Sequence, residues 1–248
     1  MAAVTFINAE WNRDVVLGNN VLRELQHSNA RTIALFASVQ FLRLDKVKKQ
    51  LKDAGIGVET ARAKRTHADA QLLGCDLYSD SFEKDIIVAS DALLYIGDGL
   101  FHPKALLMAQ AKSRKMKPVL VWNPVNERMK ILTKDDIAAQ LRKIKANLKL
   151  FIAAETIGII ATTKPGQQYL NNAKMLKQRL AKQGKKAYIF LADTIDYSHL
   201  ENFPSIKVWV NTACPRIGTD DITSLQKPIV NIREAMDPLK ALEEFSAW

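Results

Sequence analysis

Cys214 is one of only two cysteines in the chain, and its neighbours mark it as a candidate functional residue. It follows the apolar run 208–210, which predicts a buried strand, and precedes Pro215, which ends a strand ladder because proline has no N–H to donate. Asp220 and Asp221 then indicate the start of a helix. We therefore expect the thiol at the carboxyl end of a parallel strand, where open α/β sheets bind their ligands.

The second cysteine, Cys75, lies in the segment LLGCD at 72–76. The spacing of the two cysteines matches no CxxC-type metal motif, and a lone cysteine is most often a small buried residue. If the carboxyl edges of two sheets face each other, however, both thiols can meet in one cleft. Iron–sulfur clusters are held by thiolates, and a cluster that activates a substrate leaves one iron without a protein ligand. Three cysteines would hold such a cluster, and this chain offers two.

A polar loop, TTKPGQ at 162–167, follows a strand pattern and precedes a helix pattern. Gly166 permits a positive φ and a close approach of the backbone to a ligand. The N–H groups at the helix start favour an anion such as a carboxylate, and Lys164 adds positive charge. The residue order is not that of a Walker A loop. An ordinary connection with a surface lysine is the alternative.

Short apolar runs alternate with amphipathic segments along the chain, which predicts an α/β fold with parallel sheets and right-handed crossovers. The predicted strands are 32–37, 58–62, 91–96, 118–122, 157–161, 187–191, 208–212 and 228–231. The predicted helices are 44–51, one from about 82, one from 103, 135–153, 172–183 and 198–202. We expect two tandem, similar domains with helices on both faces of each sheet.

The two halves of the chain also resemble each other locally. The first strand of one half ends in ASVQ at 37–40, and the first strand of the other ends in ATTKPGQ at 161–167. We interpret this as a duplicated domain, with the halves spanning 1–124 and 125–248. Each half then carries one of the two cysteines.

The composition, 48% hydrophobic and 25% charged, is that of an ordinary globular protein. No apolar run is long enough to span a membrane, and the start lacks the regions of a signal peptide, so we expect a cytoplasmic protein. The net charge of +10 suits an acidic or phosphorylated partner. Because the lysines are spread over helix faces without interleaved aromatic residues, direct nucleic-acid binding is not expected.

Four segments together resemble the diphthamide synthase family: VNTACPRIGTDD at 210–221, LLGCD at 72–76, YIGDGLFHP at 95–103 and TTKPGQ at 162–167. In that family, S-adenosylmethionine bound to a 4Fe–4S cluster is cut to give a 3-amino-3-carboxypropyl radical, which is added to a histidine of translation elongation factor 2. The family has three similar α/β domains, and each gives one cysteine to the cluster. The resemblance covers residues 4–237 and the second and third of these domains.

The resemblance implies Cys75 and Cys214 as metal ligands, and it assigns no separate catalytic side chain. The residues it implies for the S-adenosylmethionine pocket are Thr163, Lys164, Gly166, Gln167, Arg216 and His102. Arg216 would pair with the methionine carboxylate, or alternatively form a salt bridge with Asp220 or Asp221. His102 would be a polar contact to substrate, or alternatively cap the helix that begins there.

The resemblance therefore implies an S-adenosylmethionine-dependent 3-amino-3-carboxypropyl transferase of diphthamide synthesis. Its cofactors would be a 4Fe–4S cluster and S-adenosylmethionine. Its expected partners are elongation factor 2, an electron donor, and a paralogous subunit or a second copy that supplies the missing ligand; a non-protein ligand is the other source. Two alternatives remain open: a non-catalytic subunit that stabilises or reduces a full-length paralogue, and a two-domain relative with a different substrate.

Overall fold

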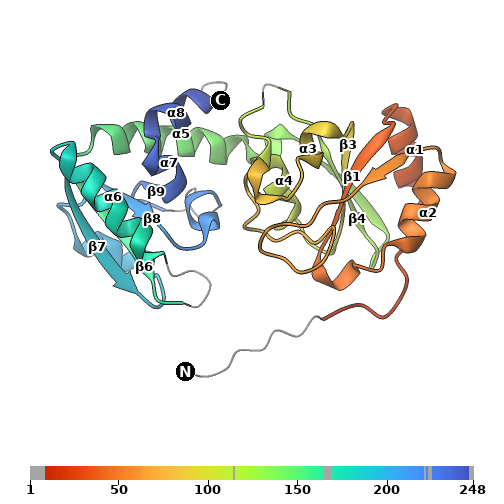
Figure 1. Ribbon diagram of the computed structural model, residues 1–248, viewed down its shortest axis with the longest axis horizontal. Helices are drawn as coiled ribbons and strands as arrows, with labels where there is room; N and C mark the ends of the chain where they lie inside the picture. Colours follow the sequence, from red (N-terminus) through yellow and green to blue (C-terminus); the bar gives the residue numbers. More distant parts are fainter. Residues whose placement is uncertain (1–8, 114, 165–168, 221, 223–224, 246–248) are drawn as a thin grey trace. The chain divides into compact units, whose positions relative to one another are not determined.

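The computed structural model describes residues 9–113, 115–164, 169–220, 222 and 225–245 (Figure 1). The chain divides into two compact units, 1–137 and 138–248, and each contains its own sheet. Both sheets are mainly parallel and are joined by helical connections, so the predicted α/β class is confirmed.

The first unit contains a five-stranded sheet with the order β2-β1-β3-β4-β5. Its strands are β1 (Thr32–Ala37), β2 (Gly57–Glu59), β3 (Ala92–Ile96), β4 (Val119–Asn123) and β5 (Arg128–Leu132). The predicted strand at 58–62 is thus shorter and ends at Glu59. β3 is buried along its whole length, and β1 and β4 are buried except at one end, as continuous apolar runs require.

Helices connect the strands of the first unit and cover its sheet. They are α1 (Asn19–His27), η1 (Val39–Phe41), α2 (Asp45–Asp53), η2 (Ser79–Ser81), α3 (Ile86–Ala89), α4 (Pro103–Ala109) and η3 (Lys134–Ile137). Figure 1 shows α1 and α2 on one side of the strands and α3 and α4 on the other. α1 and α2 each bury a pair of residues at i, i+4 spacing against alternate positions of β1 and β3.

Two helical predictions for the first unit are corrected. The helix expected from about 82 is only α3, which Asp85 begins by accepting the N–H of Val88 over 3.2 Å. No helix is predicted at 19–27, yet α1 forms there because Val21 and Leu25 reach the core. A nine-residue amphipathic segment with two buried positions gives too weak a periodicity to identify in advance.

The second unit contains a four-stranded parallel sheet with the order β7-β6-β8-β9. Its strands are β6 (Thr156–Thr162), β7 (Lys186–Ala192), β8 (Val208–Asn211) and β9 (Ile229–Asn231). Its helices are α5 (Ala138–Ala153), α6 (Leu170–Lys182), η4 (Tyr197–Asn202), η5 (Pro215–Gly218), α7 (Ile232–Met236) and α8 (Pro238–Glu244). On one face of the sheet, Trp209 packs against Phe190 and Phe203.

The order β2-β1-β3-β4 in the first sheet repeats as β7-β6-β8-β9 in the second, which supports the duplicated-domain hypothesis. The predicted boundary after residue 124 differs from the division after residue 137. The reason is β5, which runs antiparallel to β4 and pairs Arg128 with Asn123 and Leu132 with Val119. The expectation of purely parallel sheets is wrong for this strand, because a short turn after Asn123 leaves no room for a crossover.

Candidate functional site

Each sheet has a point at which the chain reverses the direction in which it adds strands, and such switch points form the ligand crevices of open α/β sheets. In the first sheet the switch point lies between β1 and β3, and in the second between β6 and β8. Cys75 belongs to the connection from β2 to β3, and Cys214 directly follows the strand β8 and its short turn. Both cysteines are half-buried, and neither forms a disulfide bond.

Backbone hydrogen bonds hold the segment before Cys75 at the carboxyl end of β1. The N–H of Ala37 donates to the carbonyl of Ala70 over 2.8 Å, and the N–H of Leu72 donates to the carbonyl of Ala37 over 2.9 Å. Ala37 pairs on its other side with Ile96, the last residue of β3. The segment before Cys75 is therefore anchored at the switch point, and the role of Cys75 as a ligand stays a prediction.

Asp76 shapes the turn that contains Cys75. Its side chain is 1% exposed, and its carboxyl accepts the N–H of Leu73 over 2.8 Å. Burial raises the pKa of Asp76 to about 6, although this hydrogen bond and the charge of Arg65 act in the opposite direction. The carboxyl is thus a buried support for the turn.

The loop after β3 packs against the same turn. A Cβ atom added at Gly74 would lie 2.2 Å from the Phe101 ring, so the glycine permits this close approach. The Phe101 ring lies 5.3 Å from that of His102, which in turn stacks 6.5 Å from the Tyr95 ring. Within the described residues, His102 makes no side-chain capping bond to α4, so the capping alternative is not supported. Its contact with substrate stays a prediction.

A shallow pocket of about 140 Å³ opens beside this loop. The stretch 97–100 forms one wall, and residues of β4 and β5 form the other. Arg128 and Lys130 line the β5 side, and Asp98 lines the loop side. The first unit therefore offers charged groups of both signs at the carboxyl ends of β3 and β4.

At the second switch point, two buried asparagines hold the turn around Cys214. The amide nitrogen of Asn211 donates to the carbonyl of Cys214 and to the side-chain oxygen of Asn231, each over 2.8 Å. The amide nitrogen of Asn231 donates to the carbonyl of Pro215 over 2.8 Å. Because buried, satisfied networks are rigid, these bonds fix the backbone that carries the thiol.

Arg216 is buried beside this turn, with 4% of its surface exposed. Its guanidinium forms an ion pair with the carboxylate of Asp220, four residues further along the chain. The salt bridge that the sequence suggests as one alternative is therefore present. Asp221, the other acid considered, lies outside the described residues. A contact between Arg216 and a ligand carboxylate stays a prediction.

The described part of the 162–167 loop lies at the carboxyl end of β6. The hydroxyl of Thr162 accepts the N–H of Lys164 over 3.2 Å, and the N–H of Thr163 donates to the carbonyl of Ala192 over 3.2 Å. Thr163 and Lys164 are exposed. Gly166 and Gln167 lie outside the described residues, so their predicted ligand contacts stay predictions.

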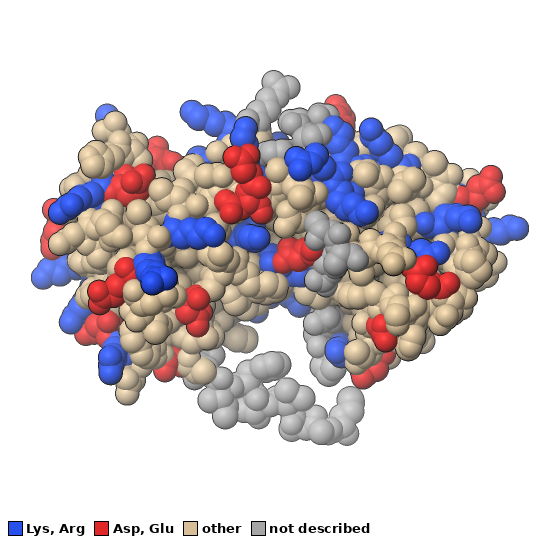
Figure 2. All heavy atoms as spheres, turned by 180° about the vertical axis from the view of Figure 1, so that it is seen from behind, with Lys and Arg blue, Asp and Glu red and all other residues tan. Residues whose placement is uncertain are grey.

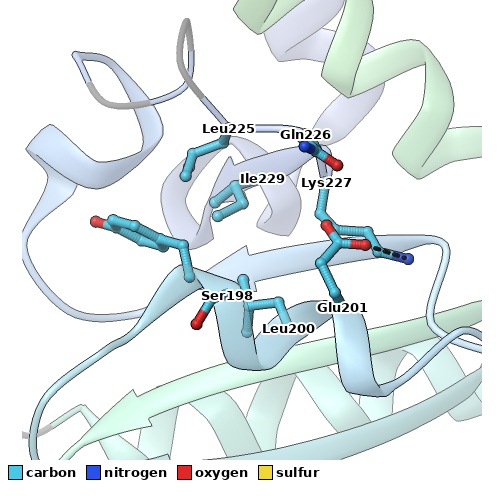
Figure 3. A pocket seen from close by; sticks show the side chains of 8 residues that line it. Ser198, Leu200, Glu201, Leu225, Gln226, Lys227 and Ile229 are labelled. Atoms are coloured by element: carbon cyan, nitrogen blue, oxygen red, sulfur yellow. Dashed lines mark ion pairs between the residues drawn. The ribbon is translucent and has the colours of Figure 1, made fainter.

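A larger pocket, of about 270 Å³, lies between η4 and the residues that lead into β9 (Figure 3). Leu200, Leu225 and Ile229 contribute apolar surface, and an ion pair of 3.7 Å joins Glu201 and Lys227 at its side. None of the predicted site residues is among those that line it. Sequence patterns gave no indication of this pocket, because it joins η4, the connection at 225–227 and the start of β9, and no local pattern brings these segments together.

Within the described ranges, no three His, Cys, Asp or Glu side chains gather as they would in a metal centre built by one chain. No described helix has the length and apolar character needed to cross a membrane. On the face shown in Figure 2, lysine and arginine side chains are interspersed with acidic ones over much of the surface. This agrees with the predicted spread of the basic residues over helix faces.

Three supports of the site are absent from the sequence predictions: Asp76, Asn211 and Asn231. Asp76 and Asn211 stand within the quoted motifs, at positions flanking each cysteine, which is the signal that identifies them. Asn231 ends β9 far along the chain, and only the pairing of Asn211 with Asn231 across β8 and β9 reveals it. Tyr95 is fully buried at the first switch point, and burial raises the pKa of its hydroxyl, so the hydroxyl stays protonated.

The fold and the two sites define a class: a tandem α/β protein with a half-buried thiol near the switch point of each mainly parallel sheet. The sequence model of the family described as "Putative diphthamide synthesis protein" matches residues 2–246. The chain therefore belongs to the diphthamide synthesis family, and the resemblance seen in its motifs is confirmed.

Relatives of known name share this match over part of their length. The 2-(3-amino-3-carboxypropyl)histidine synthase of Pyrococcus horikoshii is 29% identical over 223 residues, which cover 90% of this chain and 61% of that protein. Subunit 1 of the human synthase is 26% identical, with 85% of this chain and 45% of that protein covered. The crystal structure of Dph2 from Pyrococcus horikoshii with a 4Fe-4S cluster matches with a TM-score of 0.73, 28% identity, and coverage of 90% and 61%. The chain thus spans about three fifths or less of these relatives.

Proposed function

We propose that this chain takes part in diphthamide synthesis, as a transferase that moves the 3-amino-3-carboxypropyl group of S-adenosylmethionine to a histidine of elongation factor 2. The observation that carries the proposal is the half-buried thiol at each switch point, in a chain of this family. The relative aligned over 90% of the chain is named a 2-(3-amino-3-carboxypropyl)histidine synthase.

The donor chemistry of the two cysteines fits an iron–sulfur cluster. Cys75 and Cys214 are half-buried, so their thiolates are accessible while hydrogen bonds pin the backbone near each one. A cluster bound through both would supply the electron that cleaves a C–S bond of S-adenosylmethionine. The remaining protein ligand would come from a paralogous subunit or a second copy, or be replaced by a non-protein group.

The other site residues would bind and orient the substrate. Lys164 and the N–H groups of the 162–167 loop would hold the carboxylate of the methionine end. Arg216 would add a charge-assisted hydrogen bond to this carboxylate, beside its ion pair with Asp220. His102 would contact the substrate at the edge of the first sheet. Placement of reacting groups is the contribution a protein makes when a cofactor supplies the chemistry.

A second function, of a different class, is compatible with the donor set of the described units, each of which contains one cysteine. As a non-catalytic subunit the chain would stabilise or reduce a full-length paralogue, and the paralogue would hold the cluster.

Anaerobic reconstitution with iron and sulfide distinguishes the two functions. If the chain is a transferase, the reconstituted protein should be coloured and oxygen-sensitive and should cleave S-adenosylmethionine. The iron content per chain is measured at the same time. Cys75→Ala and Cys214→Ala should each abolish the colour, and His27→Ala, at an exposed position, should leave it unchanged. A double cysteine variant that binds iron with an unaltered spectrum would rule out the ligand assignment. A colourless parent that accelerates transfer by a full-length paralogue would support the non-catalytic subunit.

A further inference from the structure

The pocket beside η4 is separate from the two thiol sites. It is lined by η4, the connection at 225–227 and Ile229, the first residue of β9. Asn231, which supports the Cys214 turn, is the last residue of that strand. Neither Cys214 nor the asparagines that hold its turn are among the described residues that line the pocket. The proposed function therefore leaves this pocket without a role.

The inner surface of the pocket is apolar. Leu200 and Ile229 are 7% and 1% exposed, and Leu225 is half-buried beside them. Figure 3 shows these three side chains converging on the same space. Such a surface can bind a hydrocarbon side chain, because contact removes apolar surface of both from water.

A loose ion pair lies at the side of this apolar surface. The Nζ atom of Lys227 lies 3.7 Å from the Oε2 atom of Glu201, which is beyond ordinary hydrogen-bonding distance. The two side chains are 22% and 46% exposed, and an exposed pair at this separation contributes little to stability. An ammonium has three donors and a carboxylate has several acceptor positions, so both groups can bind a ligand as well.

The two charges restrict the ligand to one that carries both. A carboxylic acid without an amine would place its carboxylate beside that of Glu201, and an amine without a carboxylate would place its ammonium beside that of Lys227. In a free α-amino acid, a single carbon joins the ammonium and the carboxylate, so both can reach this pair at once. The interior of a peptide chain carries neither charge on its backbone.

The volume of the pocket sets the size of the ligand. Pockets for drug-sized molecules have roughly 300–1,000 Å³. This pocket, of about 270 Å³, lies just below that range. It suits a single amino acid with a large aliphatic side chain, and it is small for S-adenosylmethionine, which also carries a nucleoside.

We propose that this pocket binds a free α-amino acid with a large aliphatic side chain, such as leucine or methionine. The ammonium of the ligand faces Glu201 and its carboxylate faces Lys227. Its side chain packs on Leu200, Leu225 and Ile229. Binding is non-covalent and requires no metal, so the inference goes beyond the proposed function and does not depend on it.

Isothermal titration calorimetry of the full chain with leucine and with methionine tests the proposal. Two analogues are matched probes: isocaproate is leucine without its ammonium, and isoamylamine is leucine without its carboxylate. Each should bind at least about tenfold more weakly than leucine, because a charged hydrogen bond is lost. The protein is kept metal-free and reduced. Since no cluster is then present, a failure of this binding is distinguishable from a failure of the proposed function.

Substitutions of the ion pair test the assignment of the charges. Glu201→Gln and Lys227→Met each remove one charge and keep most of the side chain, and each should lower the affinity for leucine about tenfold or more. Glu243→Gln and Lys240→Met are the matched controls, at exposed positions on α8 of the same unit, and should bind leucine like the parent. Circular dichroism shows that each variant is folded.

Methyl NMR spectra of the parent locate the ligand. Saturation with leucine should shift the methyl resonances of Leu200, Leu225 and Ile229. Shifts confined to other methyl groups would overturn the proposal, as would the absence of saturable binding at millimolar concentration. Equal affinities for leucine and its two analogues would also overturn it, as would Glu201→Gln and Lys227→Met variants that bind leucine like the parent.

Discussion

At the residue scale, Asp76 is the group through which pH acts on the turn that carries Cys75. Its folded pKa of about 6 lies above the ordinary value of 3.8, because burial disfavours the carboxylate. Its contribution to stability is therefore complete below about pH 4 and is lost as pH rises through 6. Asp76→Asn keeps an acceptor for the N–H of Leu73 and removes this loss. In the metal-free protein, we expect the variant to gain about 2–3 kcal/mol relative to the parent between pH 4 and pH 7.

Urea unfolding followed by circular dichroism at several pH values measures this difference. Asp53→Asn, at an exposed position on α2, is the control and should show no comparable trend. A free-energy difference between Asp76→Asn and the parent that does not vary with pH would contradict the assignment of the buried carboxyl.

Arg216 and Asp220 form the second test at the residue scale. Substituting each partner in turn distinguishes a contribution to protein stability from a contribution to ligand binding. Arg216→Ala leaves a partly buried carboxylate without its cation and should cost about 2–4 kcal/mol of unfolding free energy. It should also lower S-adenosylmethionine affinity about tenfold, since a charge-assisted hydrogen bond is lost. Arg216→Lys keeps the charge without the fork and should recover binding in part.

Asp220→Asn is the matched variant: it removes the ion pair but keeps the guanidinium. We expect it to lower stability while affinity, measured by calorimetry on reconstituted protein, changes little. Equal affinity in the parent and all three variants would mean that Arg216 acts only as a partner of Asp220.

The position of Cys214 after a strand could be predicted from the sequence, because an apolar run that ends before a proline marks the carboxyl edge of a sheet. The orientation of the Arg216 side chain could not be predicted from the sequence. Both a buried ion pair and an exposed anion site are compatible with an arginine shortly before two aspartates, and the choice depends on packing around η5. Likewise, the contact of Phe101 with Gly74 joins two loops whose approach no local pattern specifies.

At the element scale, two lysine side chains cap the C-terminal ends of helices in the same way. The ammonium of Lys185 donates to the carbonyls of Phe151, Ile152 and Ala154 at the end of α5, over 3.3, 2.6 and 2.8 Å. Lys117 donates to carbonyls at the end of α3, over 2.8 Å to each of Ile87 and Val88. In each case burial lowers the pKa of the lysine, and the unsatisfied carbonyls of a helix end are paired.

Lys185→Met keeps the length of the side chain and removes the donor. We expect a loss of about 1–3 kcal/mol, because carbonyls at the end of α5 lose a charged partner. Lys182→Met, exposed in the last turn of α6, is the control and should change stability by less than about 0.5 kcal/mol. Chemical unfolding measures both changes. Equal unfolding midpoints for the parent and Lys185→Met would show that water satisfies these carbonyls without loss of stability.

Buried strands were the most predictable elements, since continuous apolar runs have few alternatives in a parallel sheet. β5 was not predicted, because its exposed residues carry charges and its pairing depends on the turn after β4. Close packing was also inaccessible to pattern reasoning. A Cβ atom at Gly158 would lie 2.4 Å from the ring of Trp209, so β6 needs a glycine opposite a tryptophan on β8. Such a pair involves residues far apart in the sequence.

At the scale of the whole molecule, the chain consists of two units with the same order of four strands, and each has its own sheet. A unit with its own core should fold without the other. We expect a fragment of residues 1–137 to unfold cooperatively, and a fragment of residues 138–248 to do the same. A fragment ending at 124 lacks β5 and should be less stable by at least about 2 kcal/mol. It loses the burial of Leu132, which is 0% exposed, and the backbone pairing along β4.

Urea unfolding of the three fragments, followed by circular dichroism and size-exclusion chromatography, tests this division of the chain. The fragment ending at 124 also exposes the hydrogen-bonding groups of β4 as a new apolar edge, so it should associate at high concentration. If it has the same urea midpoint of unfolding as the 1–137 fragment and remains monomeric, β5 does not contribute to the stability of the first sheet, and the division between the units belongs near residue 124. If neither fragment of the first unit folds, the unit depends on the second for stability, and the thiol sites at their switch points form only in the intact chain.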